Sequence, residues 1–311
     1  MEITYVNYVC NLKIETDSPL CKKILELVSK ENKKKLTIKI NSNKSIETFT
    51  NSQLVNATII KIGDNVNMQI DLSKFKKSKE IYFGNSFNSE FILSDSIQKI
   101  IFKRDSVFNK QNKMYPEYLL HLEFGYCFNQ PLDNLPNRLK YLLLGYQFNQ
   151  QLEFLPESLL FLEFEGSTVF NNQLDNLPNS LQKLLLGNGF NKSLDNLPNN
   201  ISTLRIKNLD TNINKFPTNI KILHLGDAKN LSNIINIKNY NCIEEIVIDD
   251  TLPKPEAIID IISGFHDYMS NLKKIICKDN YGHMMMNDAH KISNMYNLKV
   301  VNDKYFLERI K

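Results

Sequence analysis

Apolar residues recur at a fixed phase through the middle of the chain. If the first apolar residue of each run is called position 1, further apolar residues stand at positions 4 and 6, in the pattern L-x-x-L-x-L. The alternation between positions 4 and 6 predicts a short strand with one buried face. The runs begin at Ile97, Leu119, Leu139, Leu159, Leu181, Ile201, Ile220, Ile243 and Leu272, and a weaker run contains Ile81 and Phe83.

A longer repeat surrounds each run. Phe-Asn pairs begin at Phe128, Phe148, Phe170 and Phe190, so they recur after 20, 22 and 20 residues. Self-similarity at such a period predicts a solenoid, in which each repeat packs only on its neighbours. A repeat of about 20 residues cannot hold both a strand and a long helix, so we expect extended or 3₁₀ segments on the convex side.

Glycine, proline and the Phe-Asn pair each have an expected role in the repeat. Glycine at position 7 is expected to turn the chain with a positive φ. Proline three residues before position 1 favours an extended return arm. The phenylalanine would plug the turn, and its asparagine could bond unpaired backbone groups in a ladder. The glycines are Gly84, Gly125, Gly145, Gly187 and Gly226, and the prolines are Pro116, Pro136, Pro156, Pro178, Pro198 and Pro217.

The motif FNQPLDNLPNRLKYLLLGYQFNQ resembles the FNIP repeat, a leucine-rich-repeat relative abundant in social amoebae and giant DNA viruses. The resemblance covers roughly residues 78–226 and implies a leucine-rich-repeat-like fold. The family's proline after Phe-Asn is kept only at Pro131. Many members of the family carry an N-terminal F-box that recruits a ubiquitin ligase, but the segment Pro19–Val28 is not identified as one.

These patterns divide the chain into a capping region at 1–60, a solenoid at 61–230, and longer strand-helix repeats with a C-terminal cap at 231–311. The expected fold class is an α/β repeat: a leucine-rich-repeat-like solenoid with a parallel β-sheet on its concave face and few helices, mainly near the termini. Strands are expected at 3–14, 36–40, 59–62 and 298–301, and helices from Pro19, over 255–266 and over 284–295.

Composition excludes several classes of protein. The net charge of +4, from 38 basic and 34 acidic residues, is too balanced to indicate a nucleic-acid partner. No apolar run reaches the roughly 20 residues of a membrane span. The 5 cysteines are scattered without a CxxC motif, which excludes a disulfide framework. We therefore expect an intracellular protein, in the cytoplasm or in the host cytoplasm if viral. The basic run Lys74, Lys76, Lys77 and Lys79 is interpreted as a solvated face rather than a phosphate-binding patch.

Candidate catalytic and metal-binding residues find no converging partners in the sequence. His283 and His290 flank three methionines, but their spacing does not fit a metal site. Cys127 lies six residues after His121, and no further residue completes a nucleophilic site. We predict no catalytic residues, no metal and no cofactor, and therefore a protein that is not an enzyme.

The predicted binding surface lies at positions 3 and 5, which point away from the core. Solvent alone would favour polar residues there, yet an apolar patch with a charged rim is expected instead, as in protein-binding sites. The alternative is that strand propensity explains these apolar residues, or that a terminal segment covers them. The predicted partner-binding residues are Tyr141, Leu143, Phe161, Leu185, His121, Glu123, Glu163, Lys183 and Arg205.

The sequence therefore predicts a protein–protein interaction scaffold that binds a protein of unknown identity through the concave face, without a nucleic-acid or membrane partner. Two alternatives remain: the substrate-recognition subunit of a ubiquitin ligase, which the family resemblance implies, and a self-associating structural protein. The oligomeric state stays open.

Overall fold

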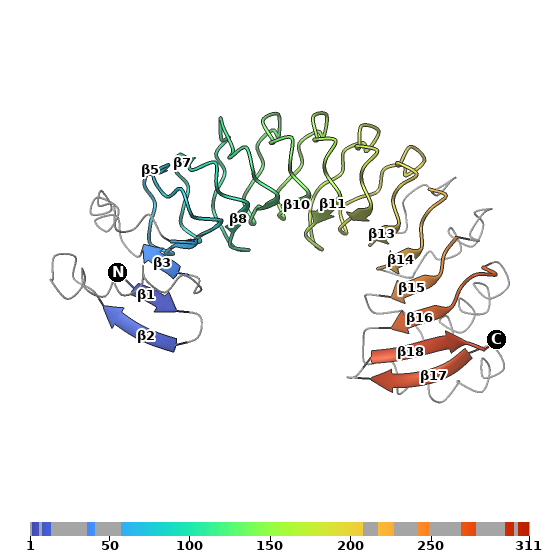
Figure 1. Ribbon diagram of the computed structural model, residues 1–311. Helices are drawn as coiled ribbons and strands as arrows, with labels where there is room; N and C mark the ends of the chain where they lie inside the picture. Colours follow the sequence, from blue (N-terminus) through green and yellow to red (C-terminus); the bar gives the residue numbers. More distant parts are fainter. Residues whose placement is uncertain are drawn as a thin grey trace. The chain divides into compact units, whose positions relative to one another are not determined.

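The structure is a computed structural model that describes residues 2–5, 8–13, 36–40, 57–207, 217–226, 242–248, 269–277, 296–301 and 304–310. The chain divides into two compact units. Figure 1 labels many of the strands along the chain. Unit 1 comprises Met1–Gln150 and Phe154–Leu159, and unit 2 comprises Gln151–Glu153 and Leu160–Lys311. The predicted helices, together with His283 and His290, lie outside the described residues, and within those residues no helix occurs.

Unit 1 contains a mostly parallel sheet with strand order β2-β1-β3-β4-β6-β8-β9-β10. From β3 onward neighbouring strands are parallel, whereas β1 pairs antiparallel with both β2 and β3. The bounds are β1 Glu2–Tyr5, β2 Tyr8–Lys13, β3 Leu36–Ile40, β4 Ile59–Ile62, β6 Glu80–Phe83, β8 Lys99–Phe102, β9 His121–Glu123 and β10 Tyr141–Leu144. The strands expected at 36–40 and 59–62 are confirmed, and they extend the parallel stack to before residue 78.

A second, two-stranded parallel sheet in unit 1 was not expected from the sequence. It joins β5 (Ile70–Leu72) to β7 (Phe91–Leu93), which lie in the return arms of successive repeats. Ile70 and Leu72 of β5 are both buried, so the strand contributes to the core of the unit.

In unit 2 the strands follow the same pattern, in the order β11-β12-β13-β14-β15-β16-β18-β17. The strands β11 to β16 are parallel, and β18 pairs antiparallel with β16 and β17. The bounds are β11 Phe161–Phe164, β12 Lys183–Leu185, β13 Thr203–Ile206, β14 Ile222–Leu225, β15 Glu245–Ile248, β16 Lys274–Cys277, β17 Tyr296–Val301 and β18 Lys304–Arg309.

The strand predictions at the two ends of the chain have different outcomes. The stretch Ile3–Ile14 is not one strand, because β1 and β2 pair antiparallel with each other. The strand expected at 298–301 is confirmed as part of β17, and among the described residues β17 pairs only with the antiparallel strand β18. The antiparallel strands β1 and β18 end the parallel stack at these two places.

The core consists of columns of apolar side chains in phase from strand to strand. Residues at position 4 face each other across neighbouring strands, for example Leu122 beside Leu142, and Leu184 beside Leu204. Position 1 is at most 1% exposed in every run from Ile97 to Leu272, and position 4 behaves in the same way. The predicted leucine-rich-repeat-like solenoid with a parallel sheet is therefore confirmed.

The Phe-Asn pairs form two further columns at the turn after each strand. In unit 1 the buried rings of Phe87, Phe108, Phe128 and Phe148 stack at centroid distances of 6.1–6.2 Å, and in unit 2 Phe170 and Phe190 stack at 6.2 Å. Each asparagine accepts a hydrogen bond through Oδ1 from the backbone N–H of the next asparagine. The donor–acceptor pairs, at 2.9–3.0 Å, are Asn88 to Asn67, Asn109 to Asn88, Asn129 to Asn109, Asn149 to Asn129, and Asn191 to Asn171. The expected asparagine ladder is therefore confirmed.

Glycine is required at position 7 for a different reason from the one expected. A Cβ on Gly145 would lie 2.0 Å from the carbonyl oxygen of Gly125, and one on Gly84 would lie 2.4 Å from that of Gly63. Neither Gly145 nor Gly84 has a left-handed φ. The close approach of successive turns, and not a positive φ, therefore excludes a side chain here.

The prolines begin turns and do not sit in extended arms. The backbone N–H of Leu139 donates to the carbonyl of Pro136 at 3.1 Å, and Leu181 donates in the same way to Pro178 at 3.0 Å. A hydrogen bond from residue i+3 to residue i closes a β-turn. Each turn directs the chain into the next strand.

Candidate functional site

Side chains at positions 3 and 5 form the face of each sheet that points away from the core, called the outward face below. Along β10, β11 and β13, half-buried outward residues alternate with fully buried inward residues. The in-phase register places outward side chains of neighbouring strands side by side, so they form two columns on a rigid support.

In unit 1 the outward face brings together four of the predicted binding residues: His121, Glu123, Tyr141 and Leu143. The His121 ring stacks on the Tyr141 ring with centroids 4.2 Å apart and an interplanar angle of 8°. Nε2 of His121 also contacts Oε1 of Glu123 in a hydrogen-bonded pair. Leu143 lies beside Glu123 on the neighbouring strand. The result is a partly exposed aromatic surface next to a carboxylate.

In unit 2 the remaining predicted residues lie on β11, β12 and β13. Glu163, Leu185 and Arg205 are neighbours across the three strands. Nη1 of Arg205 lies 3.7 Å from Oε1 of Glu163, so this ion pair passes over Leu185 on the strand between them. Arg205 also donates to the carbonyl oxygens of Phe164 at 2.8 Å and Leu186 at 3.2 Å.

The expectation that Leu185 is part of an exposed patch is therefore wrong. Leu185 is 6% exposed. The long Arg205 side chain folds back over the sheet because backbone carbonyls and Glu163 offer it charge-assisted hydrogen bonds and an ion pair. Phe161 and Lys183, which are neighbours at position 3, remain half-buried. A single patch that combines the residues of both units stays a prediction.

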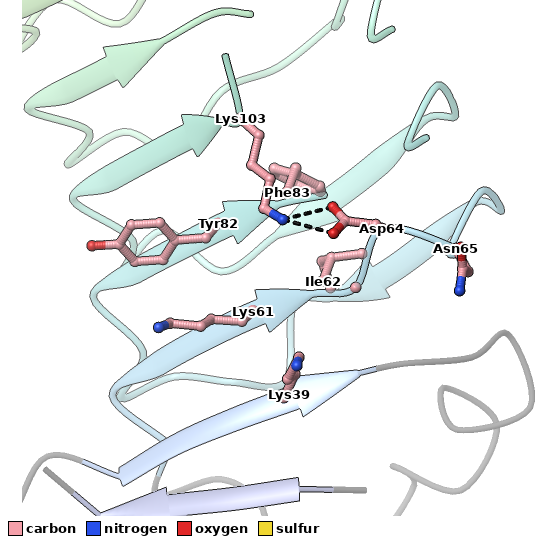
Figure 2. A pocket seen from close by; sticks show the side chains of 9 residues that line it. Lys39, Lys61, Ile62, Asp64, Asn65, Tyr82, Phe83 and Lys103 are labelled. Atoms are coloured by element: carbon pink, nitrogen blue, oxygen red, sulfur yellow. Dashed lines mark hydrogen bonds and ion pairs between the residues drawn. The ribbon is translucent and has the colours of Figure 1, made fainter. Parts of the chain in front are cut away.

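A pocket in unit 1, which the sequence did not reveal, lies near the ends of β3, β4, β6 and β8 (Figure 2). Its volume is about 570 Å³. Lys39 and Lys61 occupy position 5 of adjacent strands, beside Tyr82 at the same position of β6. The other charged lining residues are Asp64 and Lys103. Extending the repeat register before residue 78 would have placed both position-5 lysines on the outward face.

The contacts within this lysine pocket fix several side chains. Nζ of Lys103 donates to both carboxylate oxygens of Asp64, at 2.7 and 2.8 Å, and reaches across from a later repeat. Nζ of Lys61 lies 5.6 Å from the centroid of the Tyr82 ring, within the range of a cation–π interaction. The Tyr82 hydroxyl donates to Glu80 at 2.8 Å.

These contacts shift two pKa values in opposite directions. The hydrogen bond from Lys103 lowers the pKa of the Asp64 carboxyl, and the backbone N–H of Asn85 lowers it further. Burial raises the pKa of Tyr82 to about 12, and the carboxylate of Glu80 acts in the same direction. Asp64 is therefore ionised and Tyr82 is neutral near pH 7.

The basic run at Lys74–Lys79 is at the opposite ends of the strands. Lys76 and Lys79 line a smaller hollow of about 380 Å³ with Ser94, Ser96 and Tyr118. These two lysines are exposed and precede β6, whereas the lysine pocket follows the carboxyl end of β4. Lys76 and Lys79 are therefore a pair of basic residues in the same unit with which the lysines of the pocket can be compared.

Neither a metal site nor a catalytic pair is assembled by the residues that the structure describes. Among them, no group of three His, Cys, Asp or Glu side chains is placed to hold a metal ion. His121 contacts Glu123 and Tyr141 instead of forming a nucleophilic pair with Cys127. Within the same residues, no helix has the length and apolar character needed to cross a membrane. The described residues do assemble the two outward faces and the lysine pocket.

Comparison with known proteins supports the repeat assignment. Residues 128–167 match the family model of the FNIP Repeat, so the predicted resemblance is confirmed for that segment. No curated protein matches the chain. A similar solved structure is that of CroV588, described as a novel circular LRR protein structure, with a TM-score of 0.41 and 22% sequence identity. The match covers 69% of this chain and 47% of that one, so it spans less than half of CroV588.

Proposed function

We propose that this protein is a non-enzymatic protein-interaction scaffold that binds a protein partner through the outward faces of its sheets. The observation that carries the proposal is the partly exposed aromatic side chain at position 3 in each unit, Tyr141 in unit 1 and Phe161 in unit 2. Each stands on a strand whose inward residues are fully buried, so it is presented on a rigid support. Rigid, partly buried aromatic residues beside charged residues are common energetic centres of protein interfaces.

The contributing residues differ between the two units. In unit 1 they are His121, Glu123, Tyr141 and Leu143, and in unit 2 they are Phe161, Glu163, Lys183 and Arg205. Leu185 is omitted because the Glu163–Arg205 pair covers it. Repeat solenoids use such arrays as extended binding surfaces, which supports an interaction role over catalysis.

The test is affinity capture from cells of the source, followed by quantitative mass spectrometry. The baits are the wild-type chain, Tyr141→Ala, Phe161→Ala and the control Phe154→Ala. Phe154 is 63% exposed but lies outside the strands, so the control removes the same side chain as Phe161→Ala from a different surface.

We expect at least one specific partner to be lost from Tyr141→Ala or Phe161→Ala and kept by Phe154→Ala, because truncating an interface centre costs about 2 kcal/mol or more. Circular dichroism would establish that the variants remain folded. If both face variants keep every partner captured by the wild type, the proposal is wrong.

The alternative functions predict other outcomes. A substrate-recognition subunit of a ubiquitin ligase would co-purify with a Skp1-like protein through residues 1–60, and its candidate segment Pro19–Val28 lies outside the described residues. A self-associating protein would gain mass with concentration in size-exclusion chromatography with light scattering. Both alternatives stay predictions.

A further inference from the structure

The lysine pocket of unit 1 has an excess of positive charge. Its lining contains three lysines, Lys39, Lys61 and Lys103, and one carboxylate, Asp64. Glu80 contacts Tyr82 but does not line the pocket, and it stands beside Lys99 in the register of β6 and β8. Taken over its own lining, the pocket therefore carries a formal charge of +2. A solenoid repeat does not need such an arrangement, because the columns that build the core are apolar.

The positions of the lysines are set by the backbone. Lys39 and Lys61 face the same side of adjacent parallel strands, so their ammonium groups start from neighbouring backbone positions. Like charges side by side on a sheet destabilise it. Lys61 lies over the Tyr82 ring, Lys103 pairs with Asp64, and Lys39 is close enough to Asp64 to lower the pKa of its carboxyl. Two adjacent cations kept against their mutual repulsion point to a ligand of opposite charge.

The Asp64 carboxylate, which pairs with Lys103, leaves the pocket accessible to a ligand. Asp64 and Lys103 are about half exposed, at 50% and 53%. Ion pairs with this exposure are weakly held, so a ligand could share or displace the carboxylate. The pocket volume of about 570 Å³ exceeds the size of a small ion, which leaves room for the group that carries it. The Tyr82 ring forms an apolar wall for that group.

We infer that this pocket is a binding site for a dianionic phosphate group, seated between Lys39, Lys61 and Lys103 with Tyr82 as its wall. A phosphate monoester carries a charge of about −1.5 to −2 at pH 7, which matches the excess charge of the pocket better than a single carboxylate does. The phosphate is either free or carried by a peptide segment of a partner. The site lies on β3 to β8 and is lined by neither Tyr141 nor Phe161, so this inference goes beyond the proposed function.

The test uses the full chain and three probes: inorganic phosphate, a phosphoserine peptide with neutral flanking residues, and the same peptide without phosphate. Isothermal titration calorimetry measures affinity for each. We expect the phosphopeptide or inorganic phosphate to bind and the unmodified peptide not to bind. Equal affinities for phosphate and phosphopeptide would indicate a free phosphate ligand, and tighter binding of the phosphopeptide would indicate a peptide-borne one.

Substitutions in the pocket should change the affinity for phosphate in opposite directions. Lys39→Met with Lys61→Met should weaken binding about tenfold or more, since a hydrogen bond to a charged group of this kind corresponds to about one factor of ten. Asp64→Asn should strengthen binding, because it removes the competing negative charge. The control is Lys76→Met with Lys79→Met, which removes the same charges from the other hollow and should leave affinity unchanged within about twofold.

Several results would overturn the inference: no binding of phosphate or phosphopeptide, equal binding of the two peptides, or weaker binding by Asp64→Asn. Equal loss in the two double lysine variants would do the same, because it would show general attraction to a basic surface. Thermal unfolding of each variant separates loss of binding from loss of folding. Failure of this test leaves the capture experiment at Tyr141 and Phe161 unaffected, so the two proposals fail separately.

Discussion

The outward faces of the two units stand on the same backbone pattern and differ in how their charges are paired. In unit 2, Arg205 pairs with Glu163 and bonds two backbone carbonyls, and this arrangement covers Leu185. In unit 1, Lys39 and Lys61 lie side by side next to a pocket with excess positive charge. Neighbouring strands pair in phase in both units, so the difference lies in the side chains.

The two units share the contacts that fix the backbone and differ in the side chains of the outward face. Core columns, the asparagine ladder and the close glycine contacts recur in both units and fix the backbone. Residues at positions 3 and 5 are free of that constraint and vary from repeat to repeat. Where they satisfy each other, as at Arg205, the face contributes to stability. Where the side chains leave an excess of one charge, as in the lining of the lysine pocket, we propose that the face binds a ligand.

The largest expected effect removes what both units share. Phe128→Ala should destabilise the chain by about 3–5 kcal/mol, because the buried ring contacts Phe124 and stacks between Phe108 and Phe148. Urea unfolding measures the loss. Phe154→Ala, at a 63% exposed position, should change stability by less than about 0.5 kcal/mol. Similar costs for the two would show that the phenylalanine column is not a core.

The next effect tests the comparison directly. Arg205→Met should cost about 1.5–3 kcal/mol, because it removes charge-assisted hydrogen bonds to Phe164 and Leu186. Lys61→Met should change stability by no more than about 0.5 kcal/mol, since Lys61 is exposed. If denaturant unfolding gave equal losses of stability for the two variants, the distinction between the paired Arg205 and the exposed Lys61 would be contradicted.

A glycine pair tests the close approach of successive turns. Gly145→Ala should destabilise by about 1–3 kcal/mol, because its Cβ would meet the Gly125 carbonyl oxygen at 2.0 Å. Gly166→Ala is the matched control, since its Cβ would approach only the flexible Lys207 side chain, at 3.3 Å. A neutral Gly145→Ala in thermal unfolding would show that the turns can separate at little cost.

The smallest effect concerns the wall of the lysine pocket. Because folding raises the pKa of Tyr82 to about 12, its stabilising contribution is fully present below pH 10 and is lost as pH rises toward 12. A difference titration of tyrosinate absorbance, wild type minus Tyr82→Phe, isolates this residue from the other tyrosines. Titration of Tyr82 near pH 10 would contradict its burial beside Glu80.

Local patterns were sufficient to predict the inward columns, because burial on one strand face imposes a period that the sequence displays. The asparagine ladder was also accessible, since each Phe-Asn pair repeats in phase. The reason why Gly145 must be glycine could not be predicted, because a side chain there is excluded by the backbone of the preceding turn. Leu185 was misplaced because a side chain from the next repeat covers it. The lysine pocket was missed because Lys39 and Lys61 precede the visible repeat, and their register depends on strand pairing.

The most direct measurement of the central claim, that the outward face is the working surface, is site-specific photo-crosslinking in cells of the source. A photoreactive amino acid is placed at Tyr141, at Phe161 or at Phe154, and the crosslinked proteins are identified by mass spectrometry. We predict that a partner crosslinks from Tyr141 or Phe161 and not from the more exposed Phe154. Equal crosslinking of the same partner from Phe154, or none from either face position, would contradict the claim.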